Sequence, residues 1–185
     1  MKRTTVHNLI IVDASGSMSS IYNQALTGIN ETIQTIYLVD QHDPYVAQSI
    51  TLLSFANGDE KLQYIYRNED PEMVRPVTEK DYVLRGSTAL YDAIGDAVTG
   101  LKKHVCKEDK ALVTIITDGY ENASEEYSGK TVKALVSRLR EKGWVFAYIG
   151  ANQDAVEVAR DLNIANALNY DATPEGMLSM RFRFK

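Results

Sequence analysis

The chain has 185 residues, of which 44% are hydrophobic and 24% are charged, and this balance suits one soluble globular domain over residues 1–185. The formal net charge of −5 leaves no basic surplus to displace counterions, so we expect no nucleic-acid partner. The apolar run that begins at Leu9 is too short for a signal peptide or a membrane span, and the lone cysteine, Cys106, cannot form an internal disulfide. We therefore expect a cytoplasmic protein without a membrane partner.

Apolar runs alternate with amphipathic stretches along the chain, which is typical of layered α/β folds. The first strand is predicted over residues 6–12, and its continuous apolar run indicates burial on both faces. A helix is predicted next, because apolar residues recur mostly four positions apart and so form one stripe. The stripe consists of Ile21, Ala25, Ile29, Ile33 and Ile36.

Two strand-like runs then flank Asn57 and Gly58. Asn-Gly is the strongest short hairpin signal, because both positions of a tight turn tolerate positive φ. An otherwise parallel sheet is therefore predicted to carry one antiparallel strand, over residues 61–67, at its edge.

The second half of the chain continues the alternation of helices and strands. A glycine just beyond a periodic apolar stretch is typical of a helix end. We expect first a helix with a buried stripe from Leu90 to Val105, then a strand over residues 111–117 and a helix over residues 131–142 ended by Gly143. A strand over residues 144–150 and a short helix over residues 152–163, capped by Asn152, are expected next. A last strand near residues 167–171 and a helix that starts at Thr173 complete the prediction.

Three polar loops lie next to the predicted strand ends and the start of a helix. Open α/β sheets place their binding sites at the carboxyl ends of the strands, where such loops meet. The five candidate ligands in these loops offer only oxygen atoms, and three of the five are neutral hydroxyls. The candidates are Asp13, Ser15, Ser17, Thr88 and Asp118.

This ligand set favours a hard cation with octahedral preference, Mg²⁺ or Mn²⁺, over zinc or copper. Two carboxylates only neutralise a divalent ion, so the ion stays electrophilic and keeps room for an oxygen from outside. We therefore expect the ion to bind a carboxylate of another molecule. The alternative interpretation makes Ser17 and Thr88 helix caps and Asp13 an acceptor of backbone amides, but it does not explain why all five residues share one edge.

On these residues the chain resembles the von Willebrand factor type A (VWA) family, whose fold also occurs as the integrin inserted domain. The family's metal-ion-dependent adhesion site (MIDAS) reads D-x-S-x-S, then a threonine, then an aspartate. Here "DASGS" supplies Asp13, Ser15 and Ser17, "GSTALYDAI" supplies Thr88, and "TDG" supplies Asp118.

The resemblance covers nearly the whole chain and implies a three-layer α/β/α, Rossmann-like fold with a mostly parallel central sheet and one antiparallel edge strand. It implies that the serines and the threonine contact the metal directly, that the aspartates often act through water, and that Mg²⁺, Mn²⁺ or Ca²⁺ is the ion. Because it lacks bracketing cysteines, the chain more closely resembles the compact intracellular bacterial members of the family.

We expect a metal-dependent protein-binding module, without enzymatic activity, whose partner offers an aspartate or glutamate to the metal. One alternative is a metal-assisted hydrolase, such as a phosphatase, with Asp13 as nucleophile. Against it, Ser15 stands where a second acid is expected, and the three loops contain no histidine or lysine as base. The other alternative is a structural subunit whose metal only braces the loops.

Three further signals are read more simply. Cys106 lies one step from the buried stripe of its helix and is expected to be a half-buried, inert thiol. Tyr64 and Tyr66 are expected to pack on the edge strand or shield it. Glu125 and Glu126 belong either to a solvated loop or to a surface that shapes partner choice.

Overall fold

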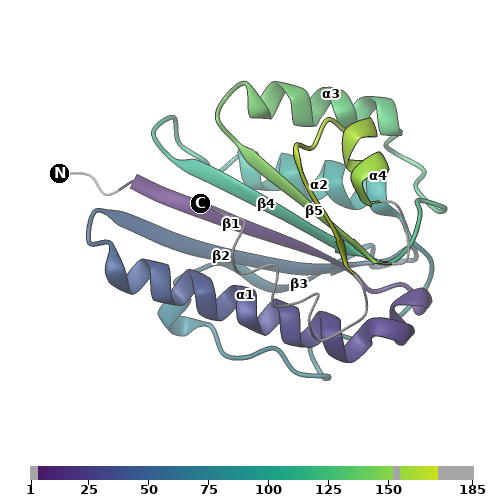
Figure 1. Cartoon of the computed structure of the whole chain (residues 1–185), viewed down its shortest axis with the longest axis horizontal. Coiled ribbons are helices and arrows are strands. Elements are labelled where there is room, and N and C mark those ends of the chain that lie inside the picture. Colours follow the sequence, from purple (N-terminus) through teal and green to yellow (C-terminus); the bar gives the residue numbers. More distant parts are fainter. Residues whose placement is uncertain (1–3, 152–154, 171–185) are drawn as a thin grey trace.

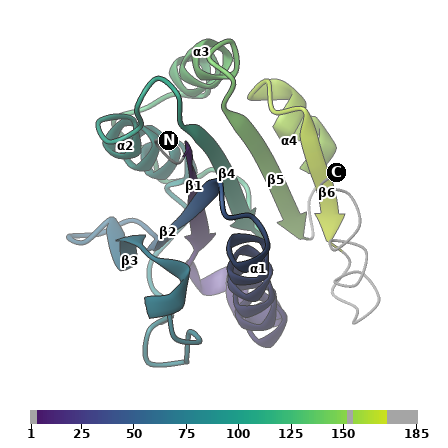
Figure 2. The same ribbon diagram turned by 90° about the vertical axis from the view of Figure 1, so that its left-hand side faces the viewer.

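The computed structural model describes residues 4–151 and 155–170, whose strands form a six-stranded sheet with helices on both faces (Figures 1 and 2). The strand order is β3-β2-β1-β4-β5-β6, and every neighbouring pair is parallel except β2 with β3. The strands are β1 (Thr4–Asp13), β2 (Val46–Phe55), β3 (Leu62–Glu69), β4 (Lys110–Thr117), β5 (Val145–Ala151) and β6 (Asn166–Tyr170).

The helices divide between the two faces of the sheet. Helix α1 packs on one face, whereas α2, α3 and α4 contribute to the hydrophobic core on the other (Figure 1). This arrangement confirms the predicted three-layer fold with one antiparallel edge strand. The helices are α1 (Tyr22–His42), α2 (Leu90–Lys102), α3 (Gly129–Arg140) and α4 (Ala155–Asp161), with short 3₁₀ helices η1 (Gly16–Ile21) and η2 (Pro71–Met73).

Strand β1 supplies side chains to both cores, as its continuous apolar run predicts. Leu9 and Ile11 point into the core under α2 and α3, whereas Ile10 and Val12 point towards α1. Successive side chains of a strand face opposite sides of the sheet, so a strand covered on both faces is apolar at every position. The central position of β1 in the sheet follows from this burial.

The predicted stripes lie on the buried faces of their helices. All five apolar residues predicted for the first helix are buried, although the first of them, Ile21, ends η1 rather than beginning α1. The second stripe is buried from Leu90 to Leu101, and Val105 packs on the same core after the helix has ended at Lys102.

The hairpin between β2 and β3 forms, but not through a tight Asn-Gly turn. The connection runs from residue 56 to residue 61, and of the Asn-Gly pair only Gly58 has a positive φ, of 121°. The strand pairing then shifts register. Leu52 faces Tyr66 but the next residue, Leu53, faces Tyr64, so β3 has one extra residue at this point. This bulge places Tyr64 against one core and Tyr66 against the other, so both tyrosines pack on the edge strand as expected.

One prediction about the second half is wrong. Cys106 is exposed rather than half-buried, because α2 ends at Lys102 and the thiol lies in the turn that leads to β4. Gly143, with a φ of 85°, follows α3 as predicted. The predicted cap Asn152 and the helix predicted from Thr173 lie outside the described residues.

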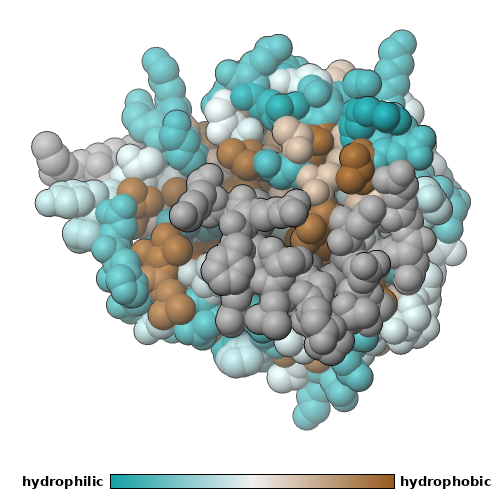
Figure 3. All heavy atoms as spheres, viewed as in Figure 1, coloured by the Kyte–Doolittle hydropathy of each residue, from teal (hydrophilic) through white to brown (hydrophobic). Residues whose placement is uncertain are grey.

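The described surface is mostly hydrophilic on the face shown in Figure 3, with hydrophobic side chains in small patches between hydrophilic ones. Large apolar side chains that are exposed among the described residues include Leu38 and Val39 near the end of α1, and Tyr45 just before β2. Within the described ranges, no helix combines the length and the apolar character needed to cross a bilayer.

Two glycines of α2 give opposite predictions. A Cβ at Gly95 would lie 2.4 Å from the Tyr127 ring, whereas a Cβ at Gly100 would have its nearest neighbour, the Tyr64 hydroxyl, 3.9 Å away. Replacing glycine by alanine inside a helix otherwise stabilises it by about 1 kcal/mol. We therefore expect Gly100→Ala to raise the free energy of unfolding in urea and Gly95→Ala to lower it. Equal effects would contradict the close packing of the Tyr127 loop on α2.

Candidate metal centre

The structure brings the five predicted site residues together at one edge of the sheet. Asp13 is the last residue of β1, and Asp118 follows directly after β4, the neighbouring strand. Ser15 and Ser17 lie where the chain turns from β1 into η1, and Thr88 lies just before α2. Because β1 and β4 are parallel neighbours, their carboxyl ends carry both loops to the same place.

The hydroxyl oxygens of the site are in contact with one another. Ser17 Oγ donates a hydrogen bond to Asp118 Oδ1 at 2.7 Å and lies 3.0 Å from Ser15 Oγ, to which Thr88 Oγ1 donates at 3.1 Å. An octahedral Mg²⁺ with bonds of about 2.1 Å has adjacent ligand atoms about 3 Å apart. The oxygen separations therefore fit neighbouring positions in such a coordination shell.

Asp13 holds the first loop in shape. Its side chain is fully buried, with Oδ1 accepting the Ser15 N–H at 2.7 Å and Oδ2 accepting the Thr117 hydroxyl at 2.6 Å. The carboxylate thus joins the end of β4 to the loop that carries both serines. Each of its oxygens has a lone pair left for a further donor, such as a metal-bound water.

Burial disfavours the charges of both site aspartates. It raises the pKa of Asp13, with a small addition from Asp118, although hydrogen bonds from Thr117 and Ser15 oppose the shift. Burial likewise raises the pKa of Asp118 against the hydrogen bond from Ser17. Among the described residues, no lysine, arginine or histidine forms an ion pair with either aspartate. A cation bound here would offset this unfavourable charge.

The site is buried at its base and open on one side. Asp13, Ser15, Thr88 and Asp118 are buried, whereas Ser17 is exposed. A Cβ added at Gly119 would lie 3.2 Å from Thr88 Oγ1 and 3.4 Å from Ser17 Oγ, so a side chain there would crowd the hydroxyls. In the part of the chain that the structure describes, no three His, Cys, Asp or Glu residues gather in a way that could hold a metal ion. The candidate site differs from such a cluster because most of its oxygen donors are hydroxyls.

Asp92, which the sequence did not single out, anchors the loop after Asp118 to α2. Its buried carboxylate accepts the backbone N–H groups of Glu125, Glu126 and Tyr127, and it pairs with Lys61 at 3.2 Å. Although burial raises the pKa of Asp92, these partners outweigh it and leave the pKa below the usual value. The only sequence signal was a charge beside an apolar stripe, which ordinarily indicates a solvated position.

Glu125 and Glu126, the two glutamates of this loop that the sequence singled out, differ in their surroundings. Glu126 forms an ion pair with Lys61 at 2.8 Å, and the Glu125 side chain is exposed. Glu121 also turns inwards, because its carboxylate accepts the N–H groups of Tyr91, Ala123 and Ser124. The loop is therefore held by specific contacts and not only by solvent, and a role of Glu125 in partner choice stays a prediction.

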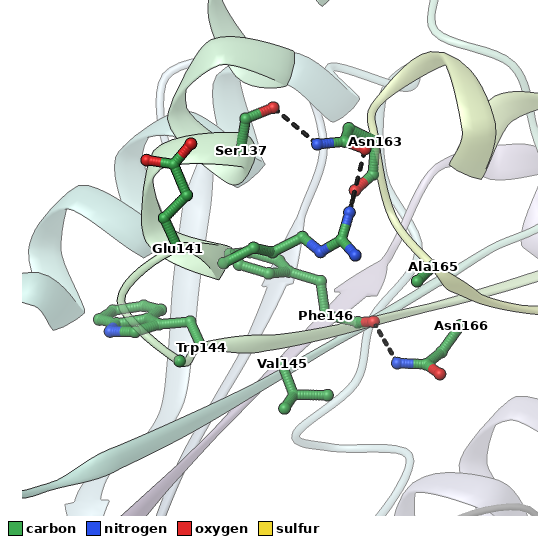
Figure 4. Close-up of a pocket in the computed structure, with 10 residues that line it drawn as sticks. Ser137, Glu141, Trp144, Val145, Phe146, Asn163, Ala165 and Asn166 are labelled. Atoms are coloured by element: carbon green, nitrogen blue, oxygen red, sulfur yellow. Dashed lines mark hydrogen bonds between the residues drawn. The ribbon is translucent and has the colours of Figure 1, made fainter.

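A separate hollow of 520 Å³ lies at the other end of the sheet, lined by residues of α3 and the first residues of β5 and β6 (Figure 4). Arg140 Nη1 crosses it to Asn163, reaching the carbonyl oxygen at 2.6 Å and Oδ1 at 3.0 Å. Asn163 in turn donates to Ser137 Oγ at 2.8 Å. These contacts join α3 to the turn after α4, so the polar groups of the hollow serve the fold.

No protein-family model and no curated protein matches this chain. Solved structures do match its fold. The VWA domain of SpRpn10 matches 97% of this chain and 94% of its own length with a TM-score of 0.63, at 14% identity. The von Willebrand factor type A protein from Catenulispora acidiphila matches 99% of this chain and 42% of its own, with a TM-score of 0.56 and 14% identity. The chain has a VWA-like fold.

A third similar structure is proximal thread matrix protein 1 from the mussel byssus, described with a zinc-occupied MIDAS motif. It matches 96% of this chain with a TM-score of 0.60 and 16% identity. The VWA-like chain spans 44% of the length of that mussel protein. At these identities the likeness concerns the fold.

The raised pKa values of Asp13 and Asp118 predict how metal binding depends on pH. Protons compete with a metal for carboxylates, so the affinity for Mn²⁺ should fall as the pH falls. Because burial raises both pKa values above 3.8, the loss should begin at a higher pH than for an ordinary aspartate. Calorimetric titration with Mn²⁺ at decreasing pH measures this, and an affinity independent of pH would contradict it.

The metal-free protein should show the opposite dependence. Its folded state binds protons more tightly at these aspartates than the unfolded state does, so their contribution to the free energy of unfolding should fall as the pH rises from about 3.8 through the raised pKa values. Urea unfolding in chelator measures the slope, and Asp118→Asn is the control, because it removes the contribution of one carboxylate.

Proposed function

We propose that the VWA-like chain binds a divalent cation, Mg²⁺ or Mn²⁺, and uses it to bind a carboxylate of a partner protein. The observation that carries the proposal is the contact of three neutral hydroxyls and a carboxylate at 2.7–3.1 Å, in which one hydroxyl, that of Ser17, belongs to an exposed residue. The residues that would hold the ion are Asp13, Ser15, Ser17, Thr88 and Asp118.

The neutrality of the hydroxyls supports binding of an external anion. When bound, the cation supplies a positive charge that the two aspartates compensate but do not exceed, which favours a carboxylate from outside. Asp13 orients Ser15 through the backbone, and Asp118 orients Ser17 through its hydroxyl. An all-oxygen set favours Mg²⁺ or Mn²⁺, with Ca²⁺ as a further candidate, over the zinc described for the mussel protein.

The surroundings of Asp13 argue against the hydrolase alternative. A nucleophilic carboxylate needs access to a substrate, but Asp13 is fully buried and both of its oxygens accept hydrogen bonds. Arg85 is held by Ser54, to whose hydroxyl and carbonyl oxygens its guanidinium donates. Asp13 is thus not an accessible nucleophile, and none of the five site residues is a base of the histidine or lysine type.

The metal itself gives the first test. We expect calorimetry to show one Mg²⁺ or Mn²⁺ bound with weak to moderate affinity. At free metal about ten times the dissociation constant, binding stabilises the fold by about 1.4 kcal/mol, so chelator should lower the melting temperature slightly without unfolding the protein. Ser17→Ala should weaken the binding, because it removes an exposed ligand, whereas Ser19→Ala on the same turn should not. Absence of a metal signal in the unmodified protein would refute the proposal.

The partner gives the second test. Proteins captured from the native cell extract in Mg²⁺ should be released by EDTA, and Thr88→Val should weaken their binding. The metal-free stability should fall by only about 1 kcal/mol, because Thr88→Val removes one hydroxyl contact, to Ser15. If binding survives both EDTA and alanine substitution of the partner's acidic residue, the metal only braces the loops.

A further inference from the structure

Two asparagines from different loops hold the backbone on which Thr88 stands. The Ser87 N–H donates to Asn57 Oδ1 at 2.6 Å, and the Asn57 N–H donates back to the Ser87 carbonyl at 2.9 Å. The Thr88 N–H donates to Asn122 Oδ1 at 3.0 Å, and the Asn122 N–H donates back to the Thr88 carbonyl at 3.1 Å. All four backbone polar groups of these two residues are thus satisfied by two asparagines.

The residues just before are tied to the loop of the two serines. The Arg85 N–H donates to the Ala14 carbonyl at 2.6 Å, and the Gly16 N–H donates to the Gly86 carbonyl at 3.2 Å. Gly86 has a φ of 56°, and a Cβ on it would lie 2.4 Å from Asn57 Oδ1. The segment of residues 85–88 therefore contacts three separate loops through its backbone, and Asn57 approaches it so closely that only glycine fits.

Core packing does not account for the two asparagines, because both are exposed. What their contacts fix is the position of one predicted ligand relative to the others. Asn122 lies in the loop that begins with Asp118, so its pair with Thr88 joins the second and third parts of the site. Asn57 holds the neighbouring residue, Ser87, from the β2–β3 connection.

We propose that Asn57 and Asn122 are positioning residues of the metal centre, which hold the Thr88 hydroxyl in place before any metal binds. This inference rests on the proposed metal site. Ligands that come from separate loops must otherwise be ordered when the ion binds, and residues that orient metal ligands typically contribute about 10–100-fold to metal affinity. Neither asparagine is among the five residues that would hold the ion.

A third asparagine provides a control, because its side chain bonds to neither Ser87 nor Thr88. Asn30 of α1 donates from Nδ2 to the Val77 carbonyl at 2.9 Å and accepts the Val77 N–H at 2.7 Å. It therefore also makes a reciprocal pair with a backbone, here through two side-chain atoms, at Val77, which lies eleven positions before Thr88 in the connection between η2 and α2. Its loss should affect stability alone.

The experiment titrates Mn²⁺ alone into Asn122→Leu, Asn57→Leu and Asn30→Leu, and records each melting temperature in chelator. Leucine has a similar size but cannot accept a hydrogen bond. We expect the first two variants to bind Mn²⁺ at least about ten-fold more weakly, and Asn30→Leu to lose stability with unchanged affinity. Asn122→Asp, which keeps the acceptor oxygen, should restore binding, measured also at raised salt to screen its added charge.

The outcomes separate this inference from the proposed function. If the unmodified protein binds no Mn²⁺, both fail. If it binds Mn²⁺ and the Asn122→Leu and Asn57→Leu variants bind it equally well, the metal site stands and the positioning role is wrong. Asn122→Ala repeats the test at this exposed position should the leucine variant not fold, and unchanged affinity there likewise overturns the role.

Discussion

The backbone of residues 85–88 is the point on which the site depends. This segment belongs to no helix or strand, so its polar groups must find partners outside regular secondary structure. They find them in the loop after β1, in the β2–β3 connection and in the loop after β4. Parallel strands bring the loops to one edge, but only these hydrogen bonds bring Thr88 Oγ1 within 3.1 Å of Ser15 Oγ.

The buried carboxylate that anchors a loop of the site, Asp92, differs from the two buried carboxylates of the site itself, Asp13 and Asp118. Asp92 is buried with three backbone N–H donors and Lys61, and its pKa lies below the usual value. Asp13 and Asp118 are buried with fewer donors and without an ion pair among the described residues, and burial raises the pKa of both. The first is satisfied by the fold alone, whereas the other two favour an added cation.

Periodicity was enough to predict the layers, because burial on one or both faces of an element leaves a direct pattern in the sequence. The position of β1 and the stripe of α1 follow from such patterns. The error at Cys106 arose because periodicity does not mark where a helix ends. The packing of Tyr64 and Tyr66 on opposite faces of the sheet could not be predicted either, because it depends on a bulge in the pairing of β3 with β2.

The sequence also indicated the five candidate ligands but not what holds them. Asn57 was interpreted as a turn residue from its neighbour Gly58, whereas in the fold its side chain binds a segment about thirty positions away. Asn122 and Asp92 carry no local signal of these contacts, because most of their partners are backbone groups, which every residue has. Contacts of this kind depend on which loops meet in space, and only the tertiary structure shows that.

In the proposed function, metal binding and partner choice depend on different groups of residues. A fold shared at 14–16% identity does not fix a partner, because function depends on the site placed on the fold. Here the candidate ligands are mostly buried and fixed through backbone contacts, whereas Tyr120 and Glu125 nearby are exposed. Exposed side chains can change without disturbing those backbone contacts. Metal affinity is therefore expected to depend on the inner hydrogen bonds, and specificity on the side chains that surround the opening.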